Sequence, residues 1–333
     1  MALSGWGASK LLLFGEHAAV YGYPAVGVAL PDGVRLHLRP DGGSWRAPEV
    51  PEPYASVLLN LLDHAESVLS RRSAPDAVRR LRGEILVETT VPPGMGFGSS
   101  AAVCTALARA VLPQLAAASS VAEPTPLDIW QLAHELEVFF HGSPSGIDTG
   151  ISNLGGIQAF TFERNGLPRA ETLDNADLFL LVGAVPRRGD TKHLVTRVKA
   201  ARQSGDPQTR RALAELGAIA ERAISVLAGN DTSRSAKRLG TLAESAQEHL
   251  RRLELSTGSL EDVIAAGTEA GSVGGKLSGA GGGGAFYLLF EDAAALRRAE
   301  AAVRRLLDRI AEGLPLFSYR VVAGDAERVI TAA

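Results

Sequence analysis

The chain contains little of three features that mark other classes of protein: cysteine, charge of one sign and long apolar segments. Cys104 is its only cysteine, so no disulfide can form within the chain. Its 34 basic and 37 acidic residues are interspersed and leave a formal net charge of −3. Nucleic acids and anionic membrane surfaces are typically bound by a one-sided basic field, which this composition lacks. We therefore expect neither as a partner, and a small molecule as the ligand.

No apolar run approaches the ~18 residues that cross a membrane as a helix. Near the start of the chain, the apolar residues 11–14 are followed at once by Gly15, Glu16 and His17. This pattern differs from the basic stretch and long apolar segment of a secretory leader. The sequence accordingly predicts a chain without a membrane span and a cytoplasmic location.

Short apolar runs alternate with segments of helical periodicity along the whole chain. In the first part, they predict strands at about 10–14, 25–30, 33–39, 83–90 and 156–163, and helices at 53–72, 99–118 and 127–141. In the second part, they predict strands at 178–185, 286–290 and 317–323, and helices at 192–203, 208–228, 233–254, 258–270 and 292–312. This order indicates an α+β architecture. We expect two domains, residues 1–175 and 176–333.

A glycine-rich segment, Pro92-Pro93-Gly94-Met95-Gly96-Phe97-Gly98-Ser99-Ser100, leads into the predicted helix at 99–118. Glycines allow backbone N–H groups to approach phosphate oxygens closely, and the start of a helix favours negative charge. The segment therefore predicts a phosphate-binding loop, whose serine hydroxyls can also bind a metal ion. A tight strand-to-helix turn without a ligand is the alternative. Met95 and Phe97 are not explained by phosphate binding.

A second glycine-rich segment covers residues 275–286, in which five of the six residues from Gly279 to Gly284 are glycine. Such a run disfavours folding, because each glycine loses more conformational entropy than another residue would. It is therefore expected where the backbone must touch a ligand or another stretch of backbone.

In a third segment, Lys10 precedes an apolar strand, and Glu16 and His17 follow that strand directly. Taken alone, Lys10 is typical of an exposed strand end, and His17 is typical of a structural histidine. Polar residues at both ends of a buried strand, together with two glycine-rich loops, favour a binding site instead.

With these three segments in this order, the chain resembles the GHMP kinase superfamily. Residues 135–148 end in His141-Gly142-Ser143-Pro144-Ser145-Gly146-Ile147-Asp148 and are similar to the HGxPSGxD signature of its mevalonate kinase branch. The resemblance covers the whole chain. It implies the GHMP kinase fold, with an N-terminal domain like domain 2 of ribosomal protein S5 and a C-terminal ferredoxin-like domain.

The resemblance also implies an activity, namely ATP-dependent phosphorylation of the 5-hydroxyl group of (R)-mevalonate, which feeds isoprenoid precursor synthesis. By position, Asp148 would orient or deprotonate that hydroxyl group, and Lys10 would be its charge partner. Ser100 and Glu137 would bind Mg²⁺ as hard oxygen ligands. The residues implied at the nucleotide are Pro93, Gly94, Gly96, Gly98, Ser99, Ser100 and Ala101. Those implied at the substrate are Glu16, His17, Thr191, Gly279, Ala280 and Gly281.

Other members of the superfamily remain as alternatives: phosphomevalonate kinase, mevalonate 3-kinase and galactokinase-like enzymes. Galactokinase-like enzymes resemble the chain less, because they have an aspartate where this chain has Ala19. A homologue that binds a ligand without catalysis is disfavoured by the presence of Lys10, Glu137 and Asp148. The resemblance also allows a homodimer.

Overall fold

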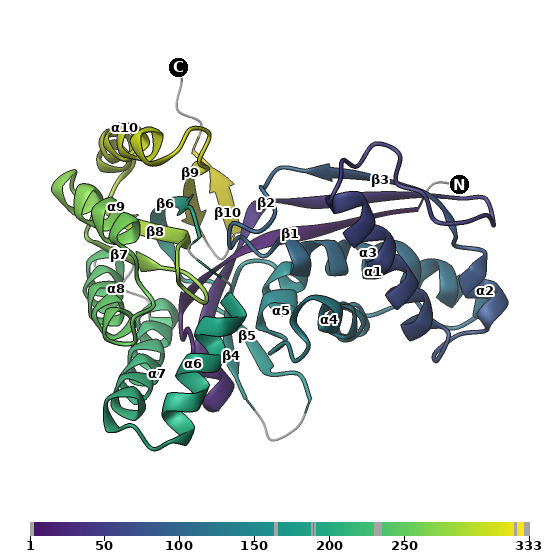
Figure 1. Cartoon of the computed structure of the whole chain (residues 1–333), viewed down its shortest axis with the longest axis horizontal. Helices are drawn as coiled ribbons and strands as arrows, with labels where there is room; N and C mark the ends of the chain where they lie inside the picture. Colours follow the sequence, from purple (N-terminus) through teal and green to yellow (C-terminus); the bar gives the residue numbers. More distant parts are fainter. Residues whose placement is uncertain are drawn as a thin grey trace. The chain divides into compact units, whose positions relative to one another are not determined.

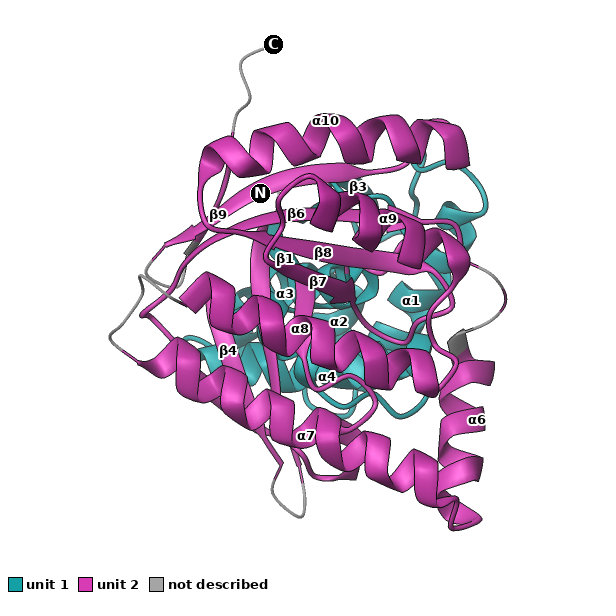
Figure 2. Ribbon diagram, turned by 90° about the vertical axis from the view of Figure 1, so that its left-hand side faces the viewer, with its two compact units in different colours: residues 1–9, 32–93, 98–154 teal, residues 10–31, 94–97, 155–333 magenta. Residues whose placement is uncertain are grey.

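The computed structural model describes residues 3–162, 166–187, 189, 191–229, 235–322 and 325–329, without the side chains of Thr191 and Asp325. The chain forms two compact units, which Figure 2 distinguishes by colour. Unit 1 comprises residues 1–9, 32–93 and 98–154, and unit 2 comprises residues 10–31, 94–97 and 155–333. The two units are groups of residues that pack together, whereas a domain is a part of the chain that folds by itself. The expected domains 1–175 and 176–333 therefore stay a prediction.

Unit 1 is built around one long helix, α3 (Ser99–Ser119), against which α4 and α5 pack. The other elements of this unit are α1 (Tyr54–Leu69), α2 (Pro75–Arg79), α4 (Pro126–His141), α5 (Ile147–Leu154) and β3 (Gly83–Thr89). The start of β1 (Leu3–Phe14) and the end of β2 (Ala25–Pro40) also belong to it. Figure 1 labels these helices and strands. Strands β2 and β3 pair in antiparallel fashion, from Val34 opposite Thr89 to Pro40 opposite Gly83.

Helix α3 lies in the hydrophobic core of unit 1. Within the part of the chain that the structure describes, it alone is long and apolar enough to cross a membrane, and 61% of its apolar window is buried. Strand β1 lies directly on it at Gly5 and Gly7, where an added Cβ would meet the backbone of Ala106 and Ala102. The absence of side chains at these two glycines thus allows β1 and α3 to approach closely.

Unit 2 contains an antiparallel five-stranded sheet in the order β10-β9-β6-β8-β7. Its strands are β6 (Asp177–Val185), β7 (Gly274–Leu277), β8 (Gly284–Phe290), β9 (Leu316–Val322) and β10 (Asp325–Arg328). Helices α8 (Ser235–Arg252), α9 (Gly258–Glu269) and α10 (Ala293–Ile310) pack against the sheet, and α7 (Pro207–Ala228) packs against α8 and α6 (Thr191–Gln203). Also in unit 2, β4 (Ile157–Thr161) pairs with residues 25–28 of β2 and with β5 (Arg169–Thr172).

The antiparallel sheets with packed helices confirm the predicted α+β class, but one predicted break is wrong. Residues 25–30 and 33–39 were expected as separate strands because Pro31, Asp32 and Gly33 are turn formers. They form the single strand β2. At this point, the hydroxyl of Thr90 accepts a hydrogen bond from Gly33 N–H at 2.9 Å, so a side chain satisfies the backbone donor. Strands β5, β7 and β10 and helices α2 and α5 were not predicted, because they are too short for a periodic signal.

Candidate active-site residues

The predicted phosphate loop has the backbone that its glycines allow. Gly94, Gly96 and Gly98 have φ angles of 77°, 100° and 74°, a left-handed region that favours glycine. Helix α3 begins directly after Gly98, and no side chain caps its first N–H groups. An uncapped helix start that follows such a loop can donate these N–H groups to an anion.

Lys10 lies beside this loop within unit 2. Its backbone N–H donates to the carbonyl oxygen of Phe97 at 2.8 Å, and its side chain is buried. Phe97 is buried as well and packs edge-to-face on Phe317 of β9, with ring centroids 5.8 Å apart. Phe97 therefore anchors the loop to the sheet, which explains an apolar residue among the glycines. Nothing in the structure explains Met95.

The two glycine-rich loops meet at Gly96. A Cβ on Gly96 would lie 2.9 Å from the backbone nitrogen of Ala285, in β8, and 3.2 Å from Arg187 Nη2. A Cβ on Gly284 would lie 2.9 Å from Arg187 Nε. The guanidinium of Arg187 thus lies beside both loops, where it can offset phosphate charge. Arg187 was not predicted from the sequence, because its position depends on contacts between distant segments.

The glycines between β7 and β8 serve two different purposes. A Cβ on Gly281 would collide with Leu255, and a Cβ on Gly283 would lie 2.9 Å from the Cα of Arg187, so both positions are required by close backbone packing. Gly279 is different, because a Cβ there would meet no described atom within 4 Å although φ is 89°. Gly279 therefore leaves open space in a loop of fixed shape.

His17 has an unusual backbone conformation, with φ of 57° in a residue that carries a Cβ. Its Nε2–H donates to the carbonyl oxygen of Ala280 at 3.1 Å, which joins the strand end after β1 to the loop at Gly279. Burial lowers the pKa of His17, and the nearby charge of Arg197 lowers it further. The neutral imidazole is therefore favoured at neutral pH.

Glu16 faces a lysine that the sequence analysis did not assign. Its carboxylate forms an ion pair with the ammonium of Lys276, and neither side chain has exposed surface. Burial raises the pKa of Glu16 and lowers the pKa of Lys276, although each charge favours the ionised form of the other. The contact of Glu16 with a substrate stays a prediction. Residues 16 and 276 lie too far apart in sequence for any local pattern to predict this pair.

In unit 1, the two predicted metal ligands lie near one imidazole. Ser100 Oγ is 3.2 Å from His141 Nε2, and Glu137 Oε1 is 3.9 Å from the same nitrogen. Glu137 and His141 share one face of α4 as an i,i+4 pair. A hydroxyl and a buried carboxylate fit Mg²⁺, which commonly takes few protein ligands and completes its shell with phosphate oxygens and water. His141 thus lies beside both predicted ligands. In the sequence, it was noted only as part of the signature.

Asp148 lies in the first turn of α5 and is half-buried. The preceding loop is shaped by Gly146, whose φ is 82° and whose carbonyl oxygen accepts from Trp130 Nε1 at 2.9 Å and from Thr149 Oγ1 at 3.3 Å. These bonds fix the backbone directly before Asp148. Thr191 begins α6, but its side chain lies outside the described residues.

Comparison with known proteins identifies the family to which this geometry belongs. Sequence models of the GHMP kinases N terminal domain and the GHMP kinases C terminal domain match residues 60–156 and 223–309. The mevalonate kinase of Thermococcus sibiricus is 31% identical over 328 residues, which cover 92% of this chain and 93% of that protein. This chain belongs to the GHMP kinase family. A second relative, the mevalonate kinase of Pyrococcus horikoshii, is 30% identical over 93% of both chains.

The fold of this GHMP kinase is also found in a solved mevalonate kinase. The crystal structure of the L. major enzyme in complex with R-mevalonate has a TM-score of 0.79 and 22% identity, and the match covers 97% of this chain and 96% of that one. The GHMP kinase fold predicted from the sequence is therefore confirmed. The resemblance to the mevalonate kinase branch is confirmed by these two relatives, because the match extends over 93% of the length of each.

Proposed function

We propose that this chain transfers the γ-phosphoryl group of ATP to the 5-hydroxyl group of (R)-mevalonate. The observation that carries this proposal is the identity of about 30% with curated mevalonate kinases over more than nine tenths of both chains. The fold supports a GHMP kinase in general, and the relatives favour mevalonate as the substrate. The segment that ends in Asp148 supports the same branch.

The proposed chemistry relies on positioning and charge, because phosphoryl transfer requires little covalent participation by the protein. Asp148 is proposed to accept a hydrogen bond from the substrate hydroxyl group and to take its proton as the phosphoryl group leaves ATP. Lys10 is proposed to offset the negative charge of the transferred group. Ser100 and Glu137 would hold Mg²⁺, which offsets the charge of the β- and γ-phosphates when bound.

The remaining residues are proposed to bind the two substrates. The loop of Pro93, Gly94, Gly96 and Gly98 and the first residues of α3, Ser99, Ser100 and Ala101, would bind the phosphates through backbone N–H groups. Arg187 would add a positive charge beside that loop. The residues proposed at the substrate are Glu16, His17, Thr191, Gly279, Ala280 and Gly281, where the space at Gly279 supports a bound ligand. The cytoplasmic location and a homodimer stay predictions.

A substrate panel tests this proposal. ADP release is measured with (R)-mevalonate, phosphomevalonate, galactose and homoserine at saturating ATP and Mg²⁺. We expect the highest kcat/KM with (R)-mevalonate. A higher value with another substrate would replace the proposed one, and no release with any of them would favour a homologue that binds a ligand without catalysis.

A further inference from the structure

Lys276 lies in β7, and its side chain has no exposed surface. It forms the ion pair with Glu16 and donates to the carbonyl oxygen of Leu277 at 2.6 Å. The ring centroids of Phe14 and Tyr287 lie 5.9 and 5.2 Å from Nζ, within the range of a cation–π interaction. This environment holds a charged lysine in one place.

Stability alone does not account for such a pair. Removing two charges from water costs several kcal/mol per ion, and apolar side chains of similar volume often stabilise a protein as well or better. The pair must therefore be explained by its effect on local geometry. Because Glu16 lies in the turn that follows β1, the pair fixes the position of that turn.

Two other contacts fix β1 but end before this turn. The hydroxyl of Ser278 accepts from Leu12 N–H at 3.0 Å and donates to the Leu12 carbonyl oxygen at 2.9 Å. Tyr287 Oη donates to the carbonyl oxygen of Leu13 at 2.8 Å. Beyond Phe14, three contacts connect the turn to the segment at 276–280. They are the Glu16–Lys276 pair, a hydrogen bond that the Glu16 carboxylate accepts from the backbone N–H of Gly279, and the bond from His17 to Ala280.

The turn needs such anchors because His17 occupies the left-handed region. For a residue with a Cβ, this conformation is unfavourable and persists only where the surroundings determine it. Without the anchor at Glu16, His17 would relax toward ordinary backbone angles. Its imidazole would then leave the loop at Gly279.

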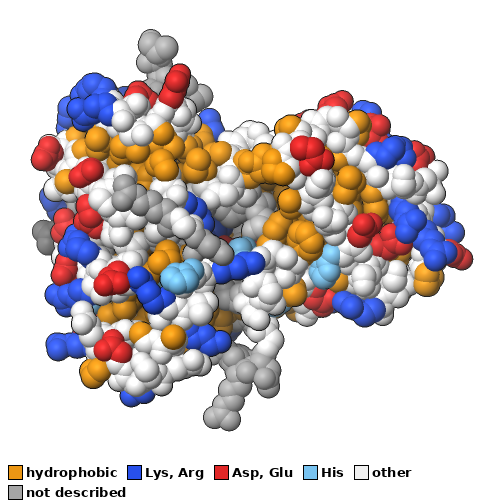
Figure 3. All heavy atoms as spheres, viewed as in Figure 1, with side chains coloured by type: hydrophobic (Ala, Val, Ile, Leu, Met, Phe, Trp, Pro, Cys, Tyr) orange, Lys and Arg blue, Asp and Glu red, His pale blue; other side chains and the backbone are white. Residues whose placement is uncertain are grey.

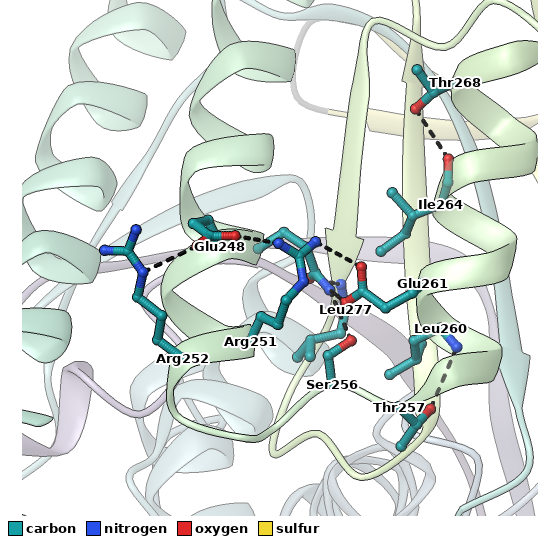
Figure 4. Close-up of polar contacts among 11 residues, drawn as sticks. Glu248, Arg251, Arg252, Ser256, Thr257, Leu260, Glu261, Ile264, Thr268 and Leu277 are labelled. Carbon is teal, nitrogen blue, oxygen red and sulfur yellow. Dashed lines mark hydrogen bonds and ion pairs between the residues drawn. The ribbon is translucent and has the colours of Figure 1, made fainter. Parts of the chain in front are cut away.

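The backbone of β7 next to Lys276 is held by a second group of side chains. Gln247, buried in α8, accepts from Leu277 N–H at 3.0 Å and donates to Ser256 Oγ at 2.9 Å and Glu261 Oε1 at 2.8 Å. Figure 4 shows Leu277, Ser256 and Glu261 converging, with Arg251 joined to Glu261. The backbone on which Lys276 stands is thus held by a network of its own.

We propose that Lys276 is a positioning residue for phosphoryl transfer, which acts through Glu16 by holding the turn at 15–17 so that His17 faces the substrate beside Gly279. This inference rests on the proposed function and deepens it. Glu16 is then a link between Lys276 and His17. The substrate contact of this turn is then assigned to His17, in place of the contact predicted for Glu16.

A double-mutant cycle tests this inference on the full chain. The variants are Lys276→Met, Glu16→Met and the two combined, and each is characterised by kcat and KM for (R)-mevalonate, by ATP affinity and by melting temperature. Lys237→Met is the control, because Lys237 forms an exposed ion pair of 3.1 Å with Glu291 in the same unit.

We expect each single variant to lower kcat/KM for mevalonate about 10- to 100-fold, mainly through KM, because a misplaced binding group has effects of this order. ATP affinity should change less than about twofold. The double variant should have a kcat/KM for mevalonate at least as high as that of the less active single variant, since both substitutions remove the same link. Its melting temperature should recover toward that of the wild type, while its activity stays low.

Two results would overturn the inference. If the losses of the single variants multiply in the double variant, Lys276 does not act through Glu16. If activity returns together with melting temperature, the pair is merely structural. Should the single variants fail to fold, the double variant alone tests the second outcome: low activity at a wild-type melting temperature supports the inference, and wild-type activity overturns it. A wild-type chain without activity toward mevalonate would instead refute the proposed function.

Discussion

At the scale of single residues, the backbone before Asp148 is the best defined part of the proposed chemistry. Gly146 receives hydrogen bonds from Trp130 and Thr149, and Asp148 follows in the first turn of α5. We predict that Asp148→Asn lowers kcat about 10²- to 10⁴-fold, because the amide cannot take the proton, while ATP affinity stays the same. Turnover and nucleotide titration measure the two quantities. Asp262→Asn, at an exposed position of α9, is the matched control.

The backbone of His17 gives a prediction that is independent of activity. Replacing His17 with glycine or alanine removes the same imidazole, but only alanine retains the cost of the left-handed conformation. We expect His17→Gly to be about 1 kcal/mol more stable than His17→Ala in urea unfolding. At His193, which is exposed in α6, the order should be reversed, because glycine is the poorer helix former. Equal stability of the two His17 variants would argue against backbone strain there.

The buried pair predicts how stability depends on pH. In Lys276→Met, the carboxyl group of Glu16 remains buried without its cation, and we expect a loss of about 3–5 kcal/mol at neutral pH. In the wild type, burial raises the pKa of Glu16 and the charge of Lys276 lowers it. Without Lys276 this lowering effect is lost, so the native variant binds more protons than its unfolded state, and its deficit relative to wild type grows as pH rises above about 4.3. The other titratable groups beside it are Tyr287 and His17.

Urea unfolding at pH 5 and pH 8 measures this dependence. The deficit of Lys276→Met relative to wild type should be larger at pH 8 than at pH 5. The exposed control Lys237→Met should show a small deficit that hardly changes with pH. A deficit of Lys276→Met that is constant, or that shrinks as pH rises, would contradict an ionised Glu16 in that site.

At the scale of elements, the contact between β1 and α3 depends on the absence of side chains. Gly7 lies so close to α3 that a Cβ would be 2.9 Å from the Cα of Ala102. We predict that Gly7→Ala costs about 1–3 kcal/mol, since the strand or the helix must move. Gly258→Ala is the control, because a Cβ at this first residue of α9 meets open space. A similar effect of both substitutions on urea unfolding would disprove the close packing.

The elements themselves were largely predictable from the sequence. Helices with clear apolar periodicity, such as α3 and α4, begin and end within about two residues of their predicted bounds, and α4 begins at a capping box of Thr125 and Asp128. Strand β2 was predicted as two, because Pro31 and Gly33 are turn formers whose effect is overridden by pairing with neighbouring strands. Local patterns therefore predict the elements better than the breaks between them.

The candidate site was predictable where it depends on motifs and unpredictable where it depends on contacts. Lys10, the loop at Gly96 and the loop at Gly279 were singled out by composition, and the structure brings these segments of unit 2 together. Lys276 and Arg187 were not assigned, because their significance comes from Glu16 and from backbone far away in the sequence. A single sequence contains no local signal for such pairs.

At the scale of the whole molecule, the distribution of charge and the family both indicate a small molecule as the ligand. On the face shown in Figure 3, acidic and basic side chains lie among one another, as their interspersed order in the sequence suggests. Similarity extends over both family models and more than nine tenths of the curated relatives. Proteins that share one fold can act on many different substrates, so the proposal of mevalonate as the substrate rests on the relatives and not on the fold.

The position of the new phosphate group tests the central claim most directly. The chain is incubated with ATP, Mg²⁺ and (R)-mevalonate, and the product is observed by proton-coupled ³¹P NMR. Phosphorylation of the 5-hydroxyl group predicts a triplet, because the phosphorus couples to the two protons on C5. A singlet would place the phosphate on the tertiary carbon C3, and the absence of a phosphomonoester signal other than that of the control without enzyme would contradict the proposed activity altogether.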